Sequence, residues 1–282
     1  MWKTRTGSVR DSQEVGILEC IECELVTHSE DLSSLVNYGT GSMHKWAAGY
    51  GDNLSSPKSD HLRRILIIEE LKEAFNIETV LDFGCGNGEL LQLLSLSHEV
   101  FGIEPDSGVR KLEQQGTLSG QIFDSLDTAI RARVSVDLVT LFHVVEHLYN
   151  PSEELAGIRK LLNPGGLLVV ETPNSIDALL VTYESLDFQN FSYWSHHPML
   201  YSRKSLEELV RRCGFGILKV EGVQRYGLEN HLHWLSKGLP GGHEKWKGLL
   251  SPSTLQSYAE DLARLGQSDT LLLVAQKPHS SR

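Results

Sequence analysis

Short apolar runs alternate with helix-like periodicity along the chain from about residue 60 onward. Four of these runs have the length and apolar character of buried strands, and they lie at residues 80–83, 98–103, 134–142 and 167–171. A helix is expected over residues 60–75, with a core-facing side formed by Leu62, Ile65, Leu66 and Leu71. Strands that alternate with helices are typical of a parallel, doubly wound sheet, so the pattern predicts an α/β fold.

Three glycines stand at alternate positions directly after the first of these strands. The segment reads LDFGCGNGELL, with a carboxylate at Asp82 and glycines at Gly84, Gly86 and Gly88. Glycines let the backbone approach a bound ligand closely. A dinucleotide fingerprint requires a different glycine spacing, and Asp82 would repel a pyrophosphate. S-adenosylmethionine (SAM) has an ammonium and a sulfonium and no phosphate, so the charge of Asp82 favours SAM over NAD.

The pattern D-x-G-x-G-x-G resembles motif I of the class I SAM-dependent methyltransferases. With the segments GIEPD, VTLFHVVEHL and LLNPGGLLVVETPN, it makes residues 60–222 similar to the subgroup of the ubiquinone-biosynthesis O-methyltransferases and many sugar methyltransferases. The resemblance implies a Rossmann-like methyltransferase fold, with a mostly parallel seven-stranded sheet and an antiparallel last strand. The apolar runs at residues 215–220 and 270–275 are then the sixth and last strands.

The chain is longer than a minimal methyltransferase domain, so we expect an additional N-terminal segment and insertions in the domain. Residues 1–57 are expected to form an N-terminal cap, whose glycine- and aromatic-rich part either closes over SAM or only packs against the core. The methyltransferase domain is expected over residues 58–282. It would contain an aromatic acceptor loop at residues 172–201, after strand five, which is far longer than an ordinary α/β connection. A second insertion, at residues 222–268 after strand six, would complete the acceptor pocket or build a dimer contact.

The resemblance assigns the cofactor site residue by residue. The three glycines make room for the methionine part of SAM, and Asp82 is expected to hold its ammonium. Glu104, at the end of the second strand, is expected to accept hydrogen bonds from the ribose hydroxyls. Asp124 or Ser125 is a candidate for the adenine amine, with a turn or N-cap role as the alternative for Asp124. The expected cofactor-binding residues are Asp82, Gly84, Cys85, Gly86, Gly88, Glu104, Pro105, Asp124, Ser125 and Phe142.

Methyl transfer to a hydroxyl requires the loss of one proton, and a histidine is the natural base near neutral pH. His197 precedes YSRKSL in a pattern that resembles the subgroup's H-x-x-x-(F/Y)-(S/T)-x-x-(S/T)-L. His143 directly follows the fourth strand. Both histidines are expected to face the pocket as candidate catalytic bases, and hydrogen bonds that brace a helix are the alternative role for His197.

A metal site is a second interpretation of the segment HVVEH. On a helical turn, His143, Glu146 and His147 would share one face and could bind a divalent ion. The ubiquinone O-methyltransferases have Glu-x-x-Glu-His here and are thought to place a metal on it, whereas this chain has His143 in the first position. We therefore expect no metal, with Glu146 and His147 only capping and positioning the loop.

A Cys-x-x-Cys pair near the N-terminus raises a separate possibility. Cys20 and Cys23 resemble half of the zinc ribbon that relatives of this subgroup often carry. A structural zinc site needs four ligands, and the chain has no second C-x-x-C. His28 or His44 could help, so structural zinc and a metal-free turn both remain open.

Composition and charge limit the partners. The net charge of −11 argues against nucleic acid or an anionic membrane as the main partner. No apolar run approaches the ~20 residues of a transmembrane helix, and the polar start lacks the apolar core of a signal peptide, so a cytoplasmic enzyme is expected.

The acceptor is expected to be a small molecule. A hydroxyl of a sugar or nucleotide-linked sugar is the first hypothesis, and a phenolic or quinone-type acceptor is the second. A SAM-binding protein without a catalytic acceptor site is the third. The oligomeric state, a homodimer included, stays open.

Overall fold

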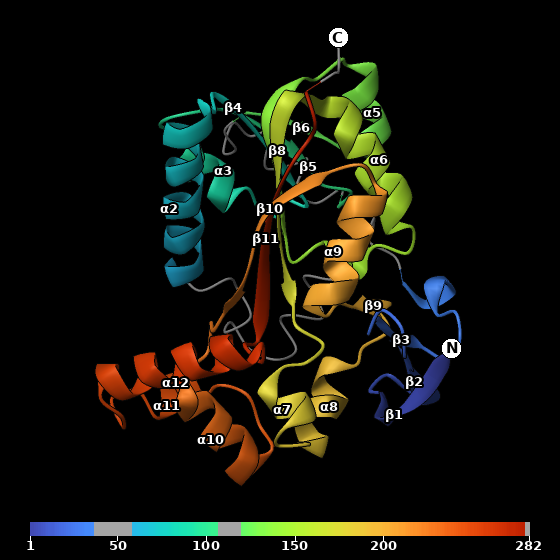
Figure 1. Ribbon diagram of the computed structural model, residues 1–282, viewed down its shortest axis with the longest axis vertical. Helices are drawn as coiled ribbons and strands as arrows, with labels where there is room; N and C mark the ends of the chain where they lie inside the picture. The colour runs from blue at the N-terminus through green and yellow to red at the C-terminus, as the bar shows by residue number, and fades with distance from the viewer. Residues whose placement is uncertain (37–57, 107–119, 280–282) are drawn as a thin grey trace.

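A seven-stranded sheet lies at the centre of the computed structural model, which describes residues 1–36, 58–106 and 120–279 (Figure 1). In spatial order its strands are β10 (Gly216–Val223), β11 (Thr270–Gln276), β8 (Leu162–Pro173), β7 (Val136–Phe142), β4 (Thr79–Phe83), β5 (Glu99–Ile103) and β6 (Gln121–Phe123). β11 is antiparallel to both of its neighbours, and the other pairings are parallel. The predicted methyltransferase-type sheet with an antiparallel last strand is therefore confirmed.

Helices cover both faces of this sheet because the strands bury alternate residues on opposite sides. On β4, for example, Val80 belongs to one buried cluster and Leu81 to the other. The first face is covered by α2 (Lys58–Phe75) and α3 (Glu89–Leu94). The second face is covered by α5 (Leu126–Arg131), α6 (Pro151–Leu161) and α9 (Arg203–Arg212). This double covering explains why the central strands read as continuous apolar runs.

The orientation of α2 differs from the expectation in part. Ile65 and Leu71 pack against the core as predicted, but Leu62 and Leu66 are 60% and 57% exposed, so their predicted burial is wrong. The buried side of the helix instead has Asp60, Arg64 and Ile68, which follow one another at a spacing of four residues. Asp60 and Arg64 face inward because their charged partners, Arg225 and Glu171, lie on that side of the helix.

The N-terminal residues form a second, antiparallel sheet. It contains β1 (Trp2–Val9), β2 (Ser12–Cys20), β3 (Val26–His28) and β9 (Met199–Leu200), in that order, and a short 3-10 helix, η1 (Ser33–Leu35), follows β3. β9 belongs to the predicted acceptor loop, and it pairs with β3 through Thr27 and Met199. The N-terminal part is therefore joined to the acceptor loop by backbone pairing. The expected glycine- and aromatic-rich passage lies outside the described residues.

The two insertions lie together at the carboxyl edge of the large sheet (Figure 1). Residues 172–201 contain α7 (Ala178–Val181) and α8 (Leu186–Ser192), and residues 222–268 contain α10 (Leu228–Lys237), α11 (Gly242–Lys245) and α12 (Pro252–Leu265). A hydrogen bond of 2.9 Å between the hydroxyls of Tyr183 and Tyr258 links them. Among the described helices, none is long and apolar enough to cross a membrane.

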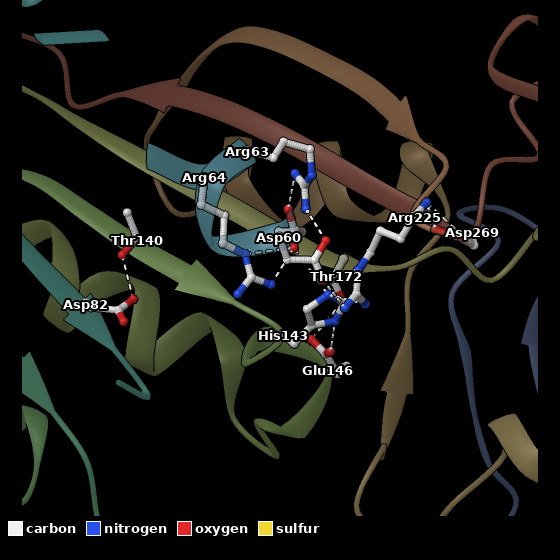
Figure 2. Close-up of polar contacts among 11 residues, drawn as sticks. Asp60, Arg63, Arg64, Asp82, Thr140, His143, Glu146, Thr172, Arg225 and Asp269 are labelled. Atoms are coloured by element: carbon white, nitrogen blue, oxygen red, sulfur yellow. Dashed lines mark hydrogen bonds and ion pairs between the residues drawn. The ribbon is translucent and has the colours of Figure 1, made fainter. Parts of the chain in front are cut away.

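Buried ion pairs attach α2 to β8 (Figure 2). Glu171 on β8 is fully buried, and it contacts Arg63 Nη1 at 2.6 Å and Arg64 Nη2 at 2.6 Å. Burial by itself would raise the pKa of Glu171, but the nearby imidazole of His143 and the ion pairs with Arg63 and Arg64 outweigh it, so the pKa lies well below its usual value. Glu171 is thus a buried carboxylate that two guanidinium groups compensate.

We expect Glu171→Gln to lower the free energy of unfolding by about 3–5 kcal/mol, because it removes the buried charge that pairs with the buried Arg64 and the partly exposed Arg63. Urea denaturation followed by circular dichroism measures this. The matched control is Glu208→Gln, which removes the exposed pair with Arg212 on α9 and should change stability by no more than about 0.5 kcal/mol. A loss below about 1 kcal/mol for Glu171→Gln would show that the cluster does not hold α2 in place.

Candidate active site

The loop between β4 and α3 has the backbone conformation that its glycines allow. Gly84, Gly86 and Gly88 have φ angles of +77°, +51° and +74°. A Cβ atom at Gly84 would lie 2.5 Å from Val144 Cγ2, so a side chain there would collide with the loop that follows β7. A Cβ atom at Gly86 would meet no described atom within 4 Å, so this part of the loop leaves room for a ligand.

Glu104 lies directly beside the glycine loop, at the end of β5. Its Oε2 accepts a hydrogen bond from Gly86 N at 3.0 Å, and its Oε1 accepts one from Asp106 N at 3.0 Å. A carboxylate has about four lone-pair sites, so both oxygens can still accept hydroxyl protons from a ligand. The backbone contacts therefore orient Glu104 toward the loop that a cofactor would share.

Asp82 is buried near the carboxyl end of β4 (Figure 2). Thr140 on β7 donates a hydrogen bond of 2.7 Å to Asp82 Oδ1. Burial raises the pKa of Asp82 to about 6, while Thr140 and the charge of Arg64 oppose this shift. A buried carboxylate of this kind gains most from a ligand that brings a positive charge.

The remaining expected cofactor residues have mixed placements. Asp124 and Ser125 are both engaged at the start of α5, where Ser125 is the N-cap and Asp124 Oδ1 accepts a 2.7 Å hydrogen bond from Thr128 Oγ1. Phe142 is the last residue of β7, and its ring centroid lies 4.6 Å from the guanidinium carbon of Arg64. Cys85 is buried with its sulfur toward Gly102 of β5, and Pro105 is exposed. Cys85 can therefore contribute its backbone rather than its thiol.

His143 is held by a network of polar contacts (Figure 2). Its backbone has φ +59°, and its Nε2 accepts a hydrogen bond from Arg225 Nη1 at 2.9 Å, because a guanidinium can only donate. Its Nδ1 must then donate to Glu146 Oε1, which lies 3.2 Å away. Arg225 is itself paired with Asp60. Both ring nitrogens of His143 are thus occupied, which argues against its expected role as a base.

His197 has different surroundings. It is half-buried, its ring centroid lies 4.7 Å from that of His147, and no side-chain hydrogen bond joins its ring to another described residue. Burial and the neighbouring His147 lower the pKa of His197 well below its usual value, although Glu146 opposes them. The lowered pKa favours the neutral ring, which has a lone pair that can accept a proton. No helix-bracing hydrogen bond from the ring is present among the described residues.

Glu146, His147 and His197 form a cluster in η4 (Val145–His147) and the acceptor loop. Their ligand atoms all lie within 4.8 Å of one another. His147 Nδ1 donates to His196 O at 2.7 Å, which fixes the orientation of its ring. Burial alone would raise the pKa of Glu146, but the hydrogen bond with His143 and the nearby histidines bring it to about 2. The group that could hold a divalent ion thus contains His197, and not the His143 of the second interpretation, beside Glu146 and His147.

Comparison with known proteins identifies the family of the chain. Residues 54–220 match the family described as "Methyltransferase domain". The chain belongs to this methyltransferase family.

Curated relatives cover part of the methyltransferase. The chain is 25% identical over 168 residues to a ubiquinone biosynthesis O-methyltransferase of Burkholderia thailandensis. This match covers 54% of the chain and 72% of the relative. The chain is also 26% identical over 176 residues to an uncharacterized 37.1 kDa protein in transposon TN4556 of Streptomyces fradiae. This match covers 59% of the chain and 48% of that protein. This chain thus matches about half the length of the Streptomyces protein.

Solved structures support the fold of the methyltransferase. The plantazolicin methyltransferase BpumL, in complex with S-adenosylhomocysteine (SAH), is similar with a TM-score of 0.55 and 17% identity over 84% of this chain and 91% of that one. A SAM-dependent methyltransferase from Archaeoglobus fulgidus gives a TM-score of 0.50 and 21% identity, over 76% and 94% of the two chains. Family and fold together place this protein among the class I SAM-dependent methyltransferases, with SAM as the cofactor.

Sequence reasoning missed several polar residues of the methyltransferase site. Thr140, which contacts Asp82, is the polar residue inside the apolar run VDLVTLF. Arg64 and Arg225 reach the site from α2 and from the segment after β10. A polar residue in a buried strand was a readable signal for Thr140, whereas the two arginines lie in segments whose sequence gives no such signal.

The ionised form of Asp82 should be required for tight cofactor binding. Because the pKa of Asp82 is about 6, SAH affinity measured by calorimetry should be constant above about pH 7 and fall by up to about tenfold per pH unit below the pKa. Thr140→Val removes a hydrogen bond that lowers this pKa, so the midpoint should move to higher pH. Asp82→Asn should weaken binding and abolish this pH dependence. An SAH affinity that is independent of pH in the wild type would contradict the assignment.

Proposed function

We propose that this methyltransferase transfers the methyl group of SAM to a hydroxyl of a small-molecule acceptor, a sugar or nucleotide-linked sugar. The observation that carries the proposal is the half-buried imidazole of His197, which has a ring nitrogen within 4.8 Å of a carboxylate oxygen of Glu146. It lies where the acceptor loop meets the carboxyl edge of the sheet, which is where ligands bind in open α/β folds.

The residues of the glycine loop fit SAM. Its sulfonium supplies an activated methyl group when it is bound. Asp82 would hold the ammonium with its buried carboxylate, and Glu104 would accept the ribose hydroxyls with its remaining lone pairs. Open space at Gly86 allows the loop backbone to approach the methionine part. These residues bind and orient the donor and need not take part in the chemical step.

His197 would act on the acceptor. Its free ring nitrogen accepts the hydroxyl proton as the acceptor oxygen forms its bond to the methyl carbon. The resulting imidazolium lies beside Glu146, whose negative charge stabilises it. Glu146 is itself fixed by hydrogen bonds from His143 at 3.2 Å and from Thr172 Oγ1 at 2.9 Å. His143 would thus be a positioning residue.

A metal-assisted reaction on a phenolic or quinone-type acceptor is the second candidate. The cluster of Glu146, His147 and His197 supports it, since two imidazoles and a carboxylate are a common ligand set for divalent ions. The relative from Burkholderia thailandensis is named for ubiquinone biosynthesis. In this alternative His197 would be a ligand and not a base. A SAM-binding protein without an acceptor site is disfavoured, because it would not need an uncommitted imidazole at this edge.

Replacement of the base should lower turnover without affecting the cofactor. We expect His197→Ala to reduce kcat by roughly 10² to 10⁴ while SAH affinity stays within about twofold of the wild type. The matched control is His279→Ala, an exposed histidine against Gly165 near the start of β8, at the opposite edge of the sheet, and it should keep full activity. A folded His197→Ala protein with normal turnover would remove His197 from the mechanism.

The protonation state of His197 can be measured without knowing the acceptor. An NMR titration of its Cε1–H group should give a pKa below the usual 6.5, and Glu146→Gln should lower the pKa further because the carboxylate raises it. An upward shift in Glu146→Gln would contradict the proposed pairing.

Metal removal separates the two candidate reactions. If His197 is the base, dialysis against EDTA should leave turnover unchanged. Loss of turnover that magnesium or zinc restores would instead show that Glu146, His147 and His197 hold a metal. SAH binding in the dialysed protein is the control, because the glycine loop does not involve this cluster.

A further inference from the structure

The turn between β2 and β3 places two cysteines close together, away from the glycine loop. Cys20 is the last residue of β2, and Cys23 lies in the turn. The turn is closed by hydrogen bonds from Cys20 N to Leu25 O at 2.8 Å and from Glu24 N to Cys20 O at 2.9 Å. Both thiols are free and partly exposed, so a reagent in solution can reach them.

The two thiols belong to one closed turn and differ in acidity. Backbone N–H groups of Cys23 and Glu22 donate to the Cys20 sulfur, and the Cys23 side chain adds a further hydrogen bond, so the pKa of Cys20 is lowered. Partial burial raises the pKa of Cys23. An accessible thiol of lowered pKa with a second accessible thiol in the same turn is the arrangement of a reactive cysteine and its resolving partner.

A zinc site is the competing explanation of the pair. Among the described residues, no further Cys, His, Asp or Glu forms a three-ligand group with Cys20 and Cys23, and His28 is not part of one. His44 lies outside the described residues. Two thiolates alone do not complete the four ligands of a structural zinc site.

We propose that Cys20 and Cys23 are a redox-active dithiol that reacts with low-molecular-weight disulfides and closes an intramolecular disulfide. The Cys20 thiolate attacks one sulfur of the disulfide RSSR, which forms a mixed disulfide and releases RS⁻. Cys23, as its thiolate, then attacks the Cys20 sulfur and releases the second RS⁻. The two thiol protons end on the two RS⁻ groups. The dithiol is thus oxidised by two electrons, and RSSR is reduced to two RSH.

The test uses the full chain with oxidised and reduced glutathione as the probe. After equilibration at increasing ratios of oxidised to reduced glutathione, free thiols are alkylated under denaturing conditions and mapped by peptide mass spectrometry. We expect Cys20 and Cys23 to lose alkylation together, with a mass decrease of two hydrogens and no bound glutathione. Cys85, 8% exposed, and Cys213, whose thiol pKa is raised by burial, are the internal controls and should remain alkylated.

Two serine variants test the assigned order of the steps. Cys23→Ser should accumulate glutathione on Cys20, because the resolving thiol is absent. Cys20→Ser should react with glutathione disulfide more slowly than Cys23→Ser, because the remaining thiol has the higher pKa. Circular dichroism of both variants checks that the N-terminal sheet is retained.

Three results would overturn the proposal. Cys20 and Cys23 could remain alkylated at every ratio of oxidised to reduced glutathione at which Cys213 remains alkylated. Wild type could accumulate glutathione on Cys20 as Cys23→Ser does, which would show that Cys23 does not resolve the mixed disulfide. The purified protein could also contain one zinc ion that a thiol-modifying reagent releases, which would identify a metal site instead.

Discussion

A buried carboxylate on β8 organises the functional edge of this protein. Glu171 is out of contact with solvent, and an uncompensated charge in such a place costs several kcal/mol. The chain compensates it with Arg63 and Arg64 of α2 and places His143, from the loop after β7, beside it. The same ion pairs therefore fix α2 against the sheet and set where the loop after β7 begins.

This cluster explains why the neighbouring histidines have different roles. His143 is held between Arg225 and Glu146 in a left-handed backbone conformation that few non-glycine residues adopt. Its contacts, in turn, orient Glu146 toward His147 and His197. Only His197 of these three histidines makes no side-chain hydrogen bond to a described residue, so the network leaves it available for chemistry.

The N-terminal sheet contributes to the position of His197. Asp11 accepts a 3.0 Å hydrogen bond from Ser195 N, and Thr27 Oγ1 donates to Pro198 O at 2.8 Å. β3 pairs with β9 at Met199. The acceptor loop is therefore held by N-terminal residues on both sides of His197, although the glycine loop lies in the large sheet. The N-terminal residues therefore help to position the loop that contains His197.

Local sequence patterns determined the fold and the position of the cofactor loop. Apolar runs indicate strands that are buried on both faces, and Gly84, Gly86 and Gly88 indicate a left-handed backbone. Each of these signals depends only on residues that are close together along the chain. The tertiary structure alone decided which face of α2 is buried and that His197 rather than His143 joins Glu146 and His147. The reason is physical: Arg64 and Glu171 lie 107 positions apart, and only the folded chain brings such charges together and assigns their neighbours.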